Sequence, residues 1–193
     1  MHEQDETGLL ARAAKGETEA FRTLYEAHHA VLFRFAYRLT GAIEMAEDLT
    51  QECFLRLVVG NTTFDKQRGS LRQYLYGIMR NLVRQREHAS GREIDWNAED
   101  HPRSTAVAFT DSITSQELNE AVQAAISALP PLQREAIVLC EFEELSLSEA
   151  AAVAGTDVGT LKSRLHRGRE GLRRRLAPYR SHARIPLPKE SSL

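Results

Sequence analysis

The sequence SLSEAAAVAGTDVGTLKSRLHRGREGLRRR, residues 146–175, has the pattern of a short helix, a tight turn and a second, basic helix. Ser146 is a favourable N-cap and Glu149 lies three positions further on, so the two can form a capping box. Small apolar residues between them and the turn suit one packed helix face. Gly155 can end this helix, because glycine readily adopts the left-handed backbone conformation found after a helix C-terminus.

The second helix is predicted to begin after a cap at Asp157 and to reach Leu176, since Pro178 would not let it continue. Its apolar residues recur at helical spacing, and they are Val158, Leu161, Leu165, Leu172 and Leu176. The opposite side carries Thr160, Ser163, Arg167 and Arg174, with Lys162, His166 and Arg169 on its flanks. Hydroxyl, guanidinium and imidazole groups read base edges and hold phosphates, so this pattern predicts a DNA-binding helix-turn-helix. The alternative is an amphipathic hairpin with a solvated basic face.

Charge is distributed unevenly along a chain of 193 residues whose formal net charge is only −2. That length suits one or two small domains. Basic residues outnumber acids in residues 61–92 and again in residues 158–193, whereas acids dominate residues 116–157. Two basic blocks separated by acidic sequence suggest two contacts on one nucleic acid.

The two cysteines, Cys53 and Cys140, lie in apolar helical patterns without the paired Cys and His spacing of a zinc site. We expect two buried thiols in a reducing compartment, with redox sensing as the alternative. The acidic N-terminus MHEQDETG does not resemble a signal peptide, and no apolar run approaches the ~20 residues that span a membrane. No phosphate loop, nucleophile elbow or metal-ligand cluster appears. We therefore expect a cytoplasmic protein that is not an enzyme, without membrane insertion, metal or cofactor.

The residue pattern in the first part of the chain predicts helices and no strand. Met1–Thr7 is polar and is expected to be frayed, and a short helix around Leu9–Lys15 precedes a long helix over Thr18–Leu39. His28 and His29 are neighbours in the long helix, so they point in different directions and form a poor metal pair. We interpret both as ordinary helix residues.

The helix predicted over Ile43–Val59 has more apolar surface than one core face needs. A core stripe is formed by Leu49, Cys53 and Leu57, and further apolar side chains are Phe54, Leu55 and Val58, beside Asp48, Gln51 and Glu52. Such a helix is either buried on several sides or docks a partner, and the pattern favours neither interpretation.

A turn-rich loop over residues 60–69 leads to a helix over Leu71–His88 that Ser70 can cap. The residues expected to face inward are Leu71, Leu75, Ile78 and Leu82. A basic, amide-rich and aromatic surface is expected from Arg72, Gln73, Tyr74, Tyr76, Arg80, Asn81, Arg84, Gln85 and Arg86. Aromatic rings beside arginines suit stacking on unpaired bases, worth about 1–3 kcal/mol per base. A solvated basic helix with tyrosines at the core edge is the alternative.

Residues 89–114 lack helical periodicity and are predicted to be a linker, in which Trp96 is isolated. A second helical unit begins at Thr114 or Ser115, with a stripe formed by Leu118, Val122, Ala125, Ile126 and Leu129. Pro130 and Pro131 turn the chain into a helix over Leu132–Glu144. The tail from Ala177 onward holds three prolines and is expected to be disordered.

Together the two units resemble the extracytoplasmic-function (ECF) group of the bacterial sigma-70 family. The resemblance covers residues 17–176 with the linker as a gap. It is carried by AEDLTQECFLRL at residues 46–57, by the helix over residues 71–86 around Asn81, and by GTLKSRLHRGR at residues 159–169. The family implies an all-α protein of two small helical domains joined by a flexible linker. It also implies a promoter-specific initiation factor that promotes DNA melting and has no catalytic chemistry.

The resemblance implies three sets of binding residues. The clamp helices of core RNA polymerase would dock on Asp48, Gln51, Glu52, Phe54 and Leu55. The melted minus-10 element would be held by Asn61, Phe64, Arg72, Tyr74, Arg80, Asn81 and Arg84. The minus-35 element would be read by Thr160, Lys162, Ser163, Arg164, His166, Arg167 and Arg169, with Thr160 and Arg169 nearer the phosphates.

The resemblance also implies a division of the chain. It comprises an N-terminal extension over residues 1–16, region 2 over 17–90, a linker over 91–114, region 4 over 115–177 and a disordered tail over 178–193. The polymerase flap and promoter DNA are implied partners. The family commonly works under a dedicated anti-sigma factor, although no residue here indicates one.

Three positions depart from the family pattern. Tyr74 stands where the family usually has Trp, Gly77 lies in mid-helix, and Ala150 replaces the usual Ile. The first two bear on strand melting and the third on packing. Two other interpretations of the residues remain: a stand-alone DNA-binding regulator that uses only the C-terminal module, and a helical interaction protein whose basic helices bind acidic protein.

Overall fold

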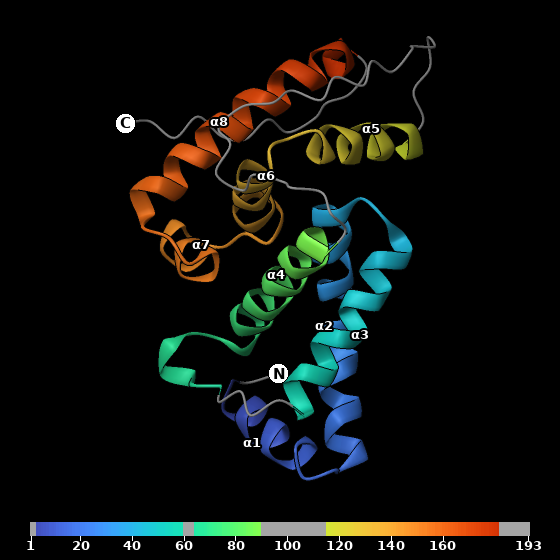
Figure 1. The fold of residues 1–193 in the computed structure, drawn as a ribbon, viewed down its shortest axis with the longest axis vertical. Coiled ribbons are helices and arrows are strands. Elements are labelled where there is room, and N and C mark those ends of the chain that lie inside the picture. The colour runs from blue at the N-terminus through green and yellow to red at the C-terminus, as the bar shows by residue number, and fades with distance from the viewer. Residues whose placement is uncertain (1–2, 60–63, 90–114, 182–193) are drawn as a thin grey trace. The chain divides into compact units, whose positions relative to one another are not determined.

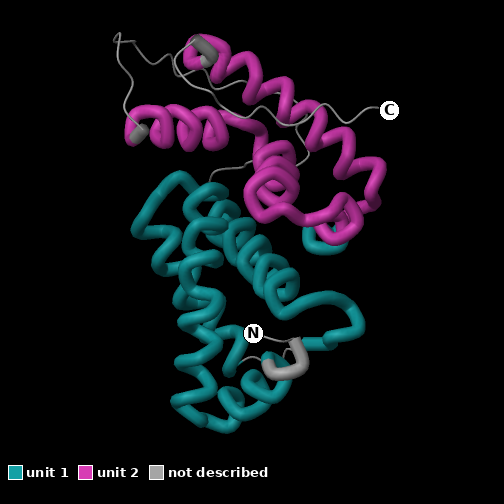
Figure 2. The backbone as a smooth tube through the Cα atoms, turned by 180° about the vertical axis from the view of Figure 1, so that it is seen from behind, with its two compact units in different colours: residues 1–93, 152–155 teal, residues 94–151, 156–193 magenta. Residues whose placement is uncertain are grey.

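The computed structural model describes residues 3–59, 64–89 and 115–181 (Figure 1). Every regular element in these ranges is helical, as the sequence predicts. The chain divides into two compact units, residues 1–93 and residues 94–151 with 156–193 (Figure 2). Residues 152–155 group with the first unit, although residues 152–154 belong to a helix that is continuous from Leu147. The predicted linker, including Trp96, lies outside the described residues.

The first unit is a bundle around one long central helix. Its elements are α1 (Glu3–Ala13), α2 (Thr18–Thr40), α3 (Ile43–Val59), the 3₁₀ turn η1 (Lys66–Arg68) and α4 (Leu71–Ala89). Helix α2 packs against α1, α3 and α4, and α3 packs against α4. Gly41 ends α2 at a φ of 72°, a left-handed conformation that lets its N–H bond the carbonyl oxygen of Tyr37 at 2.7 Å.

Helix α1 begins earlier than the sequence suggested. The prediction that Met1–Thr7 is frayed does not hold from Glu3 onward. Nε2 of His28 in α2 lies 3.1 Å from Oε1 of Glu6, and both side chains are mostly buried, so this pair ties the beginning of α1 to the bundle. Leu9 is buried one turn later. A tertiary contact to a residue far along the chain therefore orders a segment whose own composition is polar.

The inward face of α4 is wider than predicted. Tyr76, expected on the surface, is fully buried, and its ring centroid lies 4.5 Å from that of Phe35 in α2. Its hydroxyl accepts a hydrogen bond from Nε of Arg72 at 2.7 Å, which satisfies the polar end of the ring. Met79 is also buried, whereas Ile78 is only half-buried. The polar surface predicted around Asn81 therefore does not include Tyr76.

The second unit contains the predicted helix-turn-helix. Its elements are α5 (Ser115–Ser127), α6 (Pro131–Ile137), the π-helical turn η2 (Val138–Phe142), α7 (Leu147–Ala154), α8 (Val158–Leu176) and the 3₁₀ turn η3 (Ala177–Ser181). Helix α8 packs against α5, α6 and η3. The single helix predicted over Leu132–Glu144 is instead an α-helix followed by a π-helical turn, where the N–H of Glu143 bonds the carbonyl oxygen of Val138 at 3.0 Å.

The caps predicted for α7 and α8 are confirmed. The backbone N–H of Ser146 donates to Oε2 of Glu149 at 2.9 Å, and the N–H of Glu149 donates to Oγ of Ser146 at 3.3 Å. Gly155 follows α7 at a φ of 60°. Asp157 then caps α8 by accepting from the N–H of Thr160 at 2.8 Å. These local signals fix where the turn begins and ends.

Two arginines satisfy the carbonyl oxygens at the end of α5, where no helical partner remains. Nη2 of Arg134 donates to the carbonyl oxygen of Ser127 at 2.8 Å and to that of Leu129 at 3.2 Å. Nη2 of Arg175 in α8 donates to the carbonyl oxygen of Ala128 at 3.1 Å. The corner between α5 and α6 is therefore tied both to α6 and to the last turn of α8.

The prediction of disorder from Ala177 onward is wrong for Ala177–Ser181. These residues form η3, because Pro178 is tolerated in the first turn of a short helix, where its missing N–H has no partner to lose. Tyr179 is buried, which adds an apolar anchor to this turn. Residues 182–193 lie outside the described part of the chain.

Candidate binding surfaces

The face of α8 opposite its packed side carries most of the polar groups predicted to read DNA. Leu161 and Leu165 are buried, whereas Lys162, Ser163 and His166 are exposed. Arg164 and Arg167 are half-buried. The predicted apolar stripe is partly wrong, because Val158 is 45% exposed and the buried positions at the other end are Gly168 and Gly171 rather than Leu172 and Leu176.

Thr160 and Arg169 are two of the predicted DNA contacts on α8 that have partners inside the protein. The hydroxyl of Thr160 donates to Oδ2 of Asp157 at 2.6 Å, in addition to the backbone cap. Both hydrogen bonds stabilise the carboxylate, so they lower the pKa of Asp157 below its ordinary value. Arg169 donates through Nε and Nη2 to Oε1 of Glu141, at 2.8 Å and 2.5 Å. The sequence predicted neither of these pairings.

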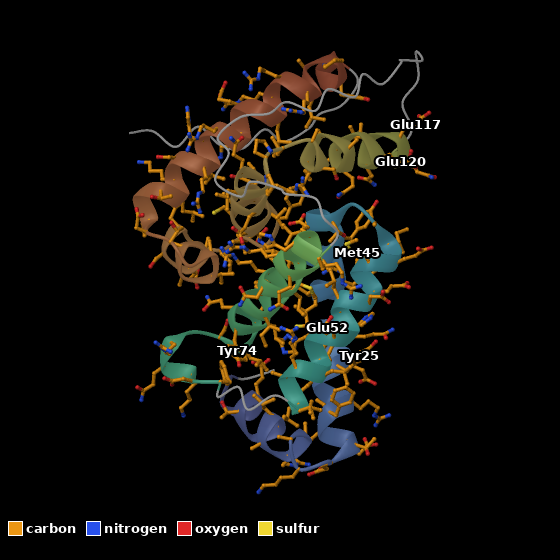
Figure 3. All side chains as sticks on the ribbon, viewed as in Figure 1. Tyr25, Met45, Glu52, Tyr74, Glu117 and Glu120 are labelled. Carbon is orange, nitrogen blue, oxygen red and sulfur yellow. The ribbon has the colours of Figure 1, made fainter. Side chains whose placement is uncertain are left out.

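The beginning of α4 presents a cluster of aromatic and basic side chains. Figure 3 shows Tyr74 at this end of the helix. Its ring centroid lies 5.6 Å from that of Phe64, so the loop and the helix share one aromatic contact. The guanidinium of Arg72 lies 5.3 Å from the ring centroid of Tyr76. Asn81 is exposed, and Arg80 and Arg84 are half-buried. Asn61 lies outside the described residues.

The junction between this loop and α4 is capped twice. Oδ1 of Asp65 accepts from the N–H of Gln67 at 3.0 Å, which stabilises η1. Ser70 and Gln73 form a capping box, with the N–H of Ser70 donating to Oε1 of Gln73 at 3.1 Å and the N–H of Gln73 donating to Oγ of Ser70 at 3.3 Å. The predicted N-cap at Ser70 is confirmed. Both caps lie in the segment between Phe64 and Tyr74, so they stabilise the backbone that carries the two rings.

The outer face of α3 combines acidic and apolar groups. Asp48 and Gln51 are exposed, and Leu55 one turn further on is 62% exposed. Phe54, in contrast, is buried against Phe21 and Tyr25, with ring centroids at 6.1 Å and 4.9 Å. The surplus apolar character of this helix therefore has two explanations. Phe54 belongs to the core, and Leu55 is uncovered.

Glu52 lies on the side of α3 that faces α4 (Figure 3). Its carboxylate accepts from Nη2 of Arg56 at 2.8 Å and lies 3.7 Å from Nη2 of Arg86 in α4. Nη2 of Arg56 also donates to Oε1 of Gln85 in α4 at 2.9 Å. A polar network thus links the acidic face of α3 with the end of α4.

The two thiols differ in their surroundings. Burial raises the pKa of Cys53 to about 12, and its Sγ lies 3.8 Å from the carbonyl oxygen of Leu75. Cys140 was predicted to be buried but is only half-buried, and partial burial raises its pKa to about 11. Both groups are neutral thiols at neutral pH, which is an unreactive state.

Within residues 3–59, 64–89 and 115–181, no group of His, Cys, Asp and Glu side chains could hold a metal ion. None of the helices in this part of the chain is long and apolar enough to cross a membrane.

Two helical units, the second with a capped helix-turn-helix and an exposed basic face, define a helical DNA-binding protein. Two models of one family match the chain: sigma-70 region 2 over residues 24–91 and sigma-70 region 4 over residues 119–172. The first match falls in the first unit, and the second falls in the second unit apart from residues 152–155.

Named relatives agree with these matches. The chain is 37% identical over 185 residues to the ECF RNA polymerase sigma factor SigE of Mycolicibacterium smegmatis, covering 91% of this chain and 70% of the relative. It is 32% identical over 177 residues to the ECF RNA polymerase sigma factor SigW of Bacillus subtilis, covering 86% and 94%.

Two solved structures are similar to the fold. One is the sigma factor RpoE from Bartonella quintana, solved with the anti-sigma factor NepR, at 27% identity and a TM-score of 0.65 over 83% of this chain and 98% of that chain. The other is CnrH, solved with the cytosolic domain of CnrY, at 25% identity and a TM-score of 0.63 over 88% and 96%. The chain therefore belongs to the ECF group of the sigma-70 family of RNA polymerase sigma factors. Its role is promoter-directed initiation of transcription.

Proposed function

We propose that this sigma factor divides its work among three helix faces. In this proposal α3 docks on core RNA polymerase, the beginning of α4 holds the minus-10 element, and α8 reads the minus-35 element. The domain boundaries that go with it are residues 17–90 for the polymerase and minus-10 functions and residues 115–177 for the minus-35 function. No step requires bond-making by the protein, since binding energy alone can drive promoter choice and strand capture.

The observation that carries the proposal is the uncovered Leu55 beside Asp48 and Gln51 on α3. A leucine that is 62% exposed next to polar and acidic groups has the composition of an interface, with an apolar centre and a polar rim. A stand-alone DNA-binding regulator would have no need of this face. Glu52 and Phe54 would contribute indirectly, by stabilising the helix that carries Leu55. Glu52 accepts a hydrogen bond from Arg56, and Phe54 packs against Phe21 and Tyr25.

The proposed minus-10 surface combines stacking and charge. The ring centroids of Phe64 and Tyr74 lie 5.6 Å apart, and bases can stack on such rings with little sequence preference. The exposed amide of Asn81 can donate to and accept from a base edge. Arg72, Arg80 and Arg84 add positive charge along the same helix, which favours a phosphate backbone. The proposal also counts Asn61 among the minus-10 residues.

The proposed minus-35 surface is the exposed face of α8. Lys162, Ser163 and His166 are exposed there, and Arg164 and Arg167 lie beside them. A recognition helix uses such groups in the major groove, where a bidentate guanidinium can distinguish guanine. Thr160 has its hydroxyl engaged with Asp157, so it would act mainly by presenting the helix N-terminus to a phosphate.

We also propose an anti-sigma factor as a regulatory partner and the cytoplasm as the place of action. Support comes from the two similar sigma factors, which were solved with NepR and with the cytosolic domain of CnrY. Stable co-purification of a second protein without polymerase would support this partner, whereas a free monomer in cells would count against it. The polymerase flap would be a further partner of the second unit.

The test is run-off transcription with purified core polymerase on a library of promoter fragments, comparing wild type with Leu55→Ala and Ile43→Ala. Ile43 is the matched control, because it is also an exposed apolar residue of α3 at 59% but lies three turns away. We expect transcripts from one sequence class, and about tenfold weaker polymerase binding for Leu55→Ala, as for a central interface residue. Equal binding by both variants would contradict the docking face. A DNA footprint without polymerase and no transcripts would contradict the proposal as a whole.

A further inference from the structure

A charged contact joins α8 to the π-helical turn η2 inside the second unit. Two donors of Arg169 converge on Oε1 of Glu141, Nε at 2.8 Å and Nη2 at 2.5 Å. The two side chains are only 27% and 23% exposed. Hydrogen bonds between charged groups are stronger than neutral ones, and partial burial protects this pair from screening by salt. We therefore expect this attachment to stabilise the second unit more than an exposed ion pair would.

The attachment lies next to a close approach between α8 and α6. A β-carbon at Gly168 would come within 2.7 Å of Cγ1 of Ile137 and 3.1 Å of the carbonyl oxygen of Gln133. At Gly168 itself no side chain of α8 resists rotation of the helix about its own axis, whereas Leu161 and Leu165 are buried about two turns and one turn earlier. Arg169 is the next residue, and its bond to Glu141 constrains the rotation at this level of the helix.

The π-helical turn is what carries Glu141. The bond from the N–H of Glu143 to the carbonyl oxygen of Val138 widens the helix by one residue in this turn. Single π-helical turns within helices occur frequently at functional sites. Here the turn supplies the carboxylate that Arg169 binds.

Rotation of α8 matters because the base-reading groups lie on the same helix. Ser163 and His166 precede Arg169 by one to two turns, or about 5–9 Å along the axis at 1.5 Å per residue. A hydrogen bond to a base edge weakens steeply when its angle is wrong. A small rotation at Arg169 would therefore be felt directly at the DNA.

We propose that Arg169 is a positioning residue rather than a DNA contact, and that Glu141 sets through it the rotation of α8 needed for minus-35 recognition. This inference rests on the proposed role of α8. It reassigns Arg169 from the phosphate-contacting set, since a guanidinium neutralised by a carboxylate offers little net charge to a phosphate. It also adds Glu141 to the residues on which promoter choice depends.

The test compares full-length variants assembled with core polymerase. The variants are Glu141→Gln, Arg169→Met, Arg169→Lys and the double variant Glu141→Gln/Arg169→Met, with Arg173→Met as the control. Arg173 belongs to an exposed pair with Glu170 on the same helix, at 2.6 Å, and reaches no other helix through it. The probe is a promoter fragment with a randomised minus-35 segment, from which wild-type holoenzyme selects its preferred sequence. Binding is then measured against salt, at a temperature where circular dichroism shows each variant folded.

We expect Glu141→Gln and Arg169→Met each to lower the preference for the selected minus-35 sequence by about 3- to 10-fold. The double variant should be no worse than either single one, because all three remove the same contact. Arg169→Lys should resemble Arg169→Met, since lysine keeps the charge but lacks the planar arrangement of donors. The salt dependence of binding and the behaviour of Arg173→Met should match wild type.

A direct phosphate contact by Arg169 predicts the opposite pattern. Glu141→Gln would then tighten binding, Arg169→Lys would resemble wild type, and Arg169→Met would reduce the salt slope by about one unit. That result, or unchanged preference in every variant, overturns the inference. If wild type itself has no minus-35 preference, the proposed role of α8 fails, and the inference fails with it.

Discussion

Gly168 of α8 lies so close to Ile137 of α6 that a β-carbon on the glycine would come within 2.7 Å of the isoleucine Cγ1. The carbonyl oxygen of Gln133 would lie 3.1 Å away on the same side. One turn further along α8, a β-carbon at Gly171 would meet Cδ2 of Leu129 at 2.6 Å. The packed side of α8 thus presents leucines in its first half and two glycines in its second half, where the glycines lie close to α6 and to Leu129.

Substitution of Gly168 by alanine is expected to destabilise the second unit. The added methyl group cannot be accommodated unless the Ile137 side chain or the helix backbone shifts, and overpacking of this kind costs typically about 1–3 kcal/mol. Chemical denaturation of the full chain, followed by circular dichroism, would measure the loss. An increase in the free energy of unfolding would contradict this expectation, because it would mean that α6 can move away from Gly168 at little cost.

Gly77→Ala is the matched substitution in the first unit, and it should have the opposite effect. Gly77 lies in the interior of α4, where a β-carbon would meet nothing within 4 Å. Alanine is favoured over glycine in a helix interior by about 1 kcal/mol, so the first unit should gain stability. The measurement is the same denaturation experiment. A loss of stability here would mean that the open space beside the glycine is filled in solution.

The neighbours Phe54 and Leu55 should separate stability from docking. Phe54→Ala removes a ring packed against Phe21 and Tyr25 and should lower the free energy of unfolding by about 3–5 kcal/mol. Leu55→Ala removes an exposed side chain and should change it by no more than about 0.5 kcal/mol. Thermal melting of both variants checks this. Comparable losses would mean that Leu55 is covered by the protein itself.

Local signals in the sequence predicted the parts of the fold that short-range chemistry controls. Ser146, Gly155 and Asp157 act on backbone groups within a few residues, so the limits of α7 and α8 could be predicted and are confirmed. The helix over Ile43–Val59 was likewise predicted to the residue. Capping and periodicity depend only on near neighbours, which is why a single sequence suffices for them.

The features that the sequence did not predict depend on contacts between distant residues. Glu6 orders α1 through His28, 22 positions away, and Glu141 binds Arg169, 28 positions away. Tyr76 occupied a predicted surface stripe but is drawn into the core by Phe35. No local pattern distinguishes a glutamate that binds a distant side chain from one that is solvated. The proposed minus-10 and minus-35 residues could be nominated by family resemblance, but their internal partners could not.

The thiols should react in the order of their exposure. Both pKa values are raised by burial, Cys53 to about 12 and Cys140 to about 11, so neither thiolate is populated at neutral pH. In the folded protein we expect slow modification by a disulfide reagent, first at Cys140, which is half-buried, and last at Cys53. Mass spectrometry of a time course measures the order. Rapid modification of Cys53 would contradict its burial and would reopen the interpretation of this residue as a redox sensor.

The cap of α8 should make the second unit sensitive to acid. Hydrogen bonds from the hydroxyl and the N–H of Thr160 lower the pKa of Asp157, so the folded state favours the carboxylate more than the unfolded state does. The resulting stabilisation is present above the pKa of the unfolded chain and is lost as the pH falls through the lower pKa of the folded state.

Asp157→Asn is the informative comparison, because asparagine is an equally good cap but does not titrate. The stability advantage of wild type over this variant should therefore be largest near neutral pH and should shrink in acid. Melting temperatures of both proteins over a pH series measure it, and a difference that stays constant with pH would contradict the role of the Asp157 charge.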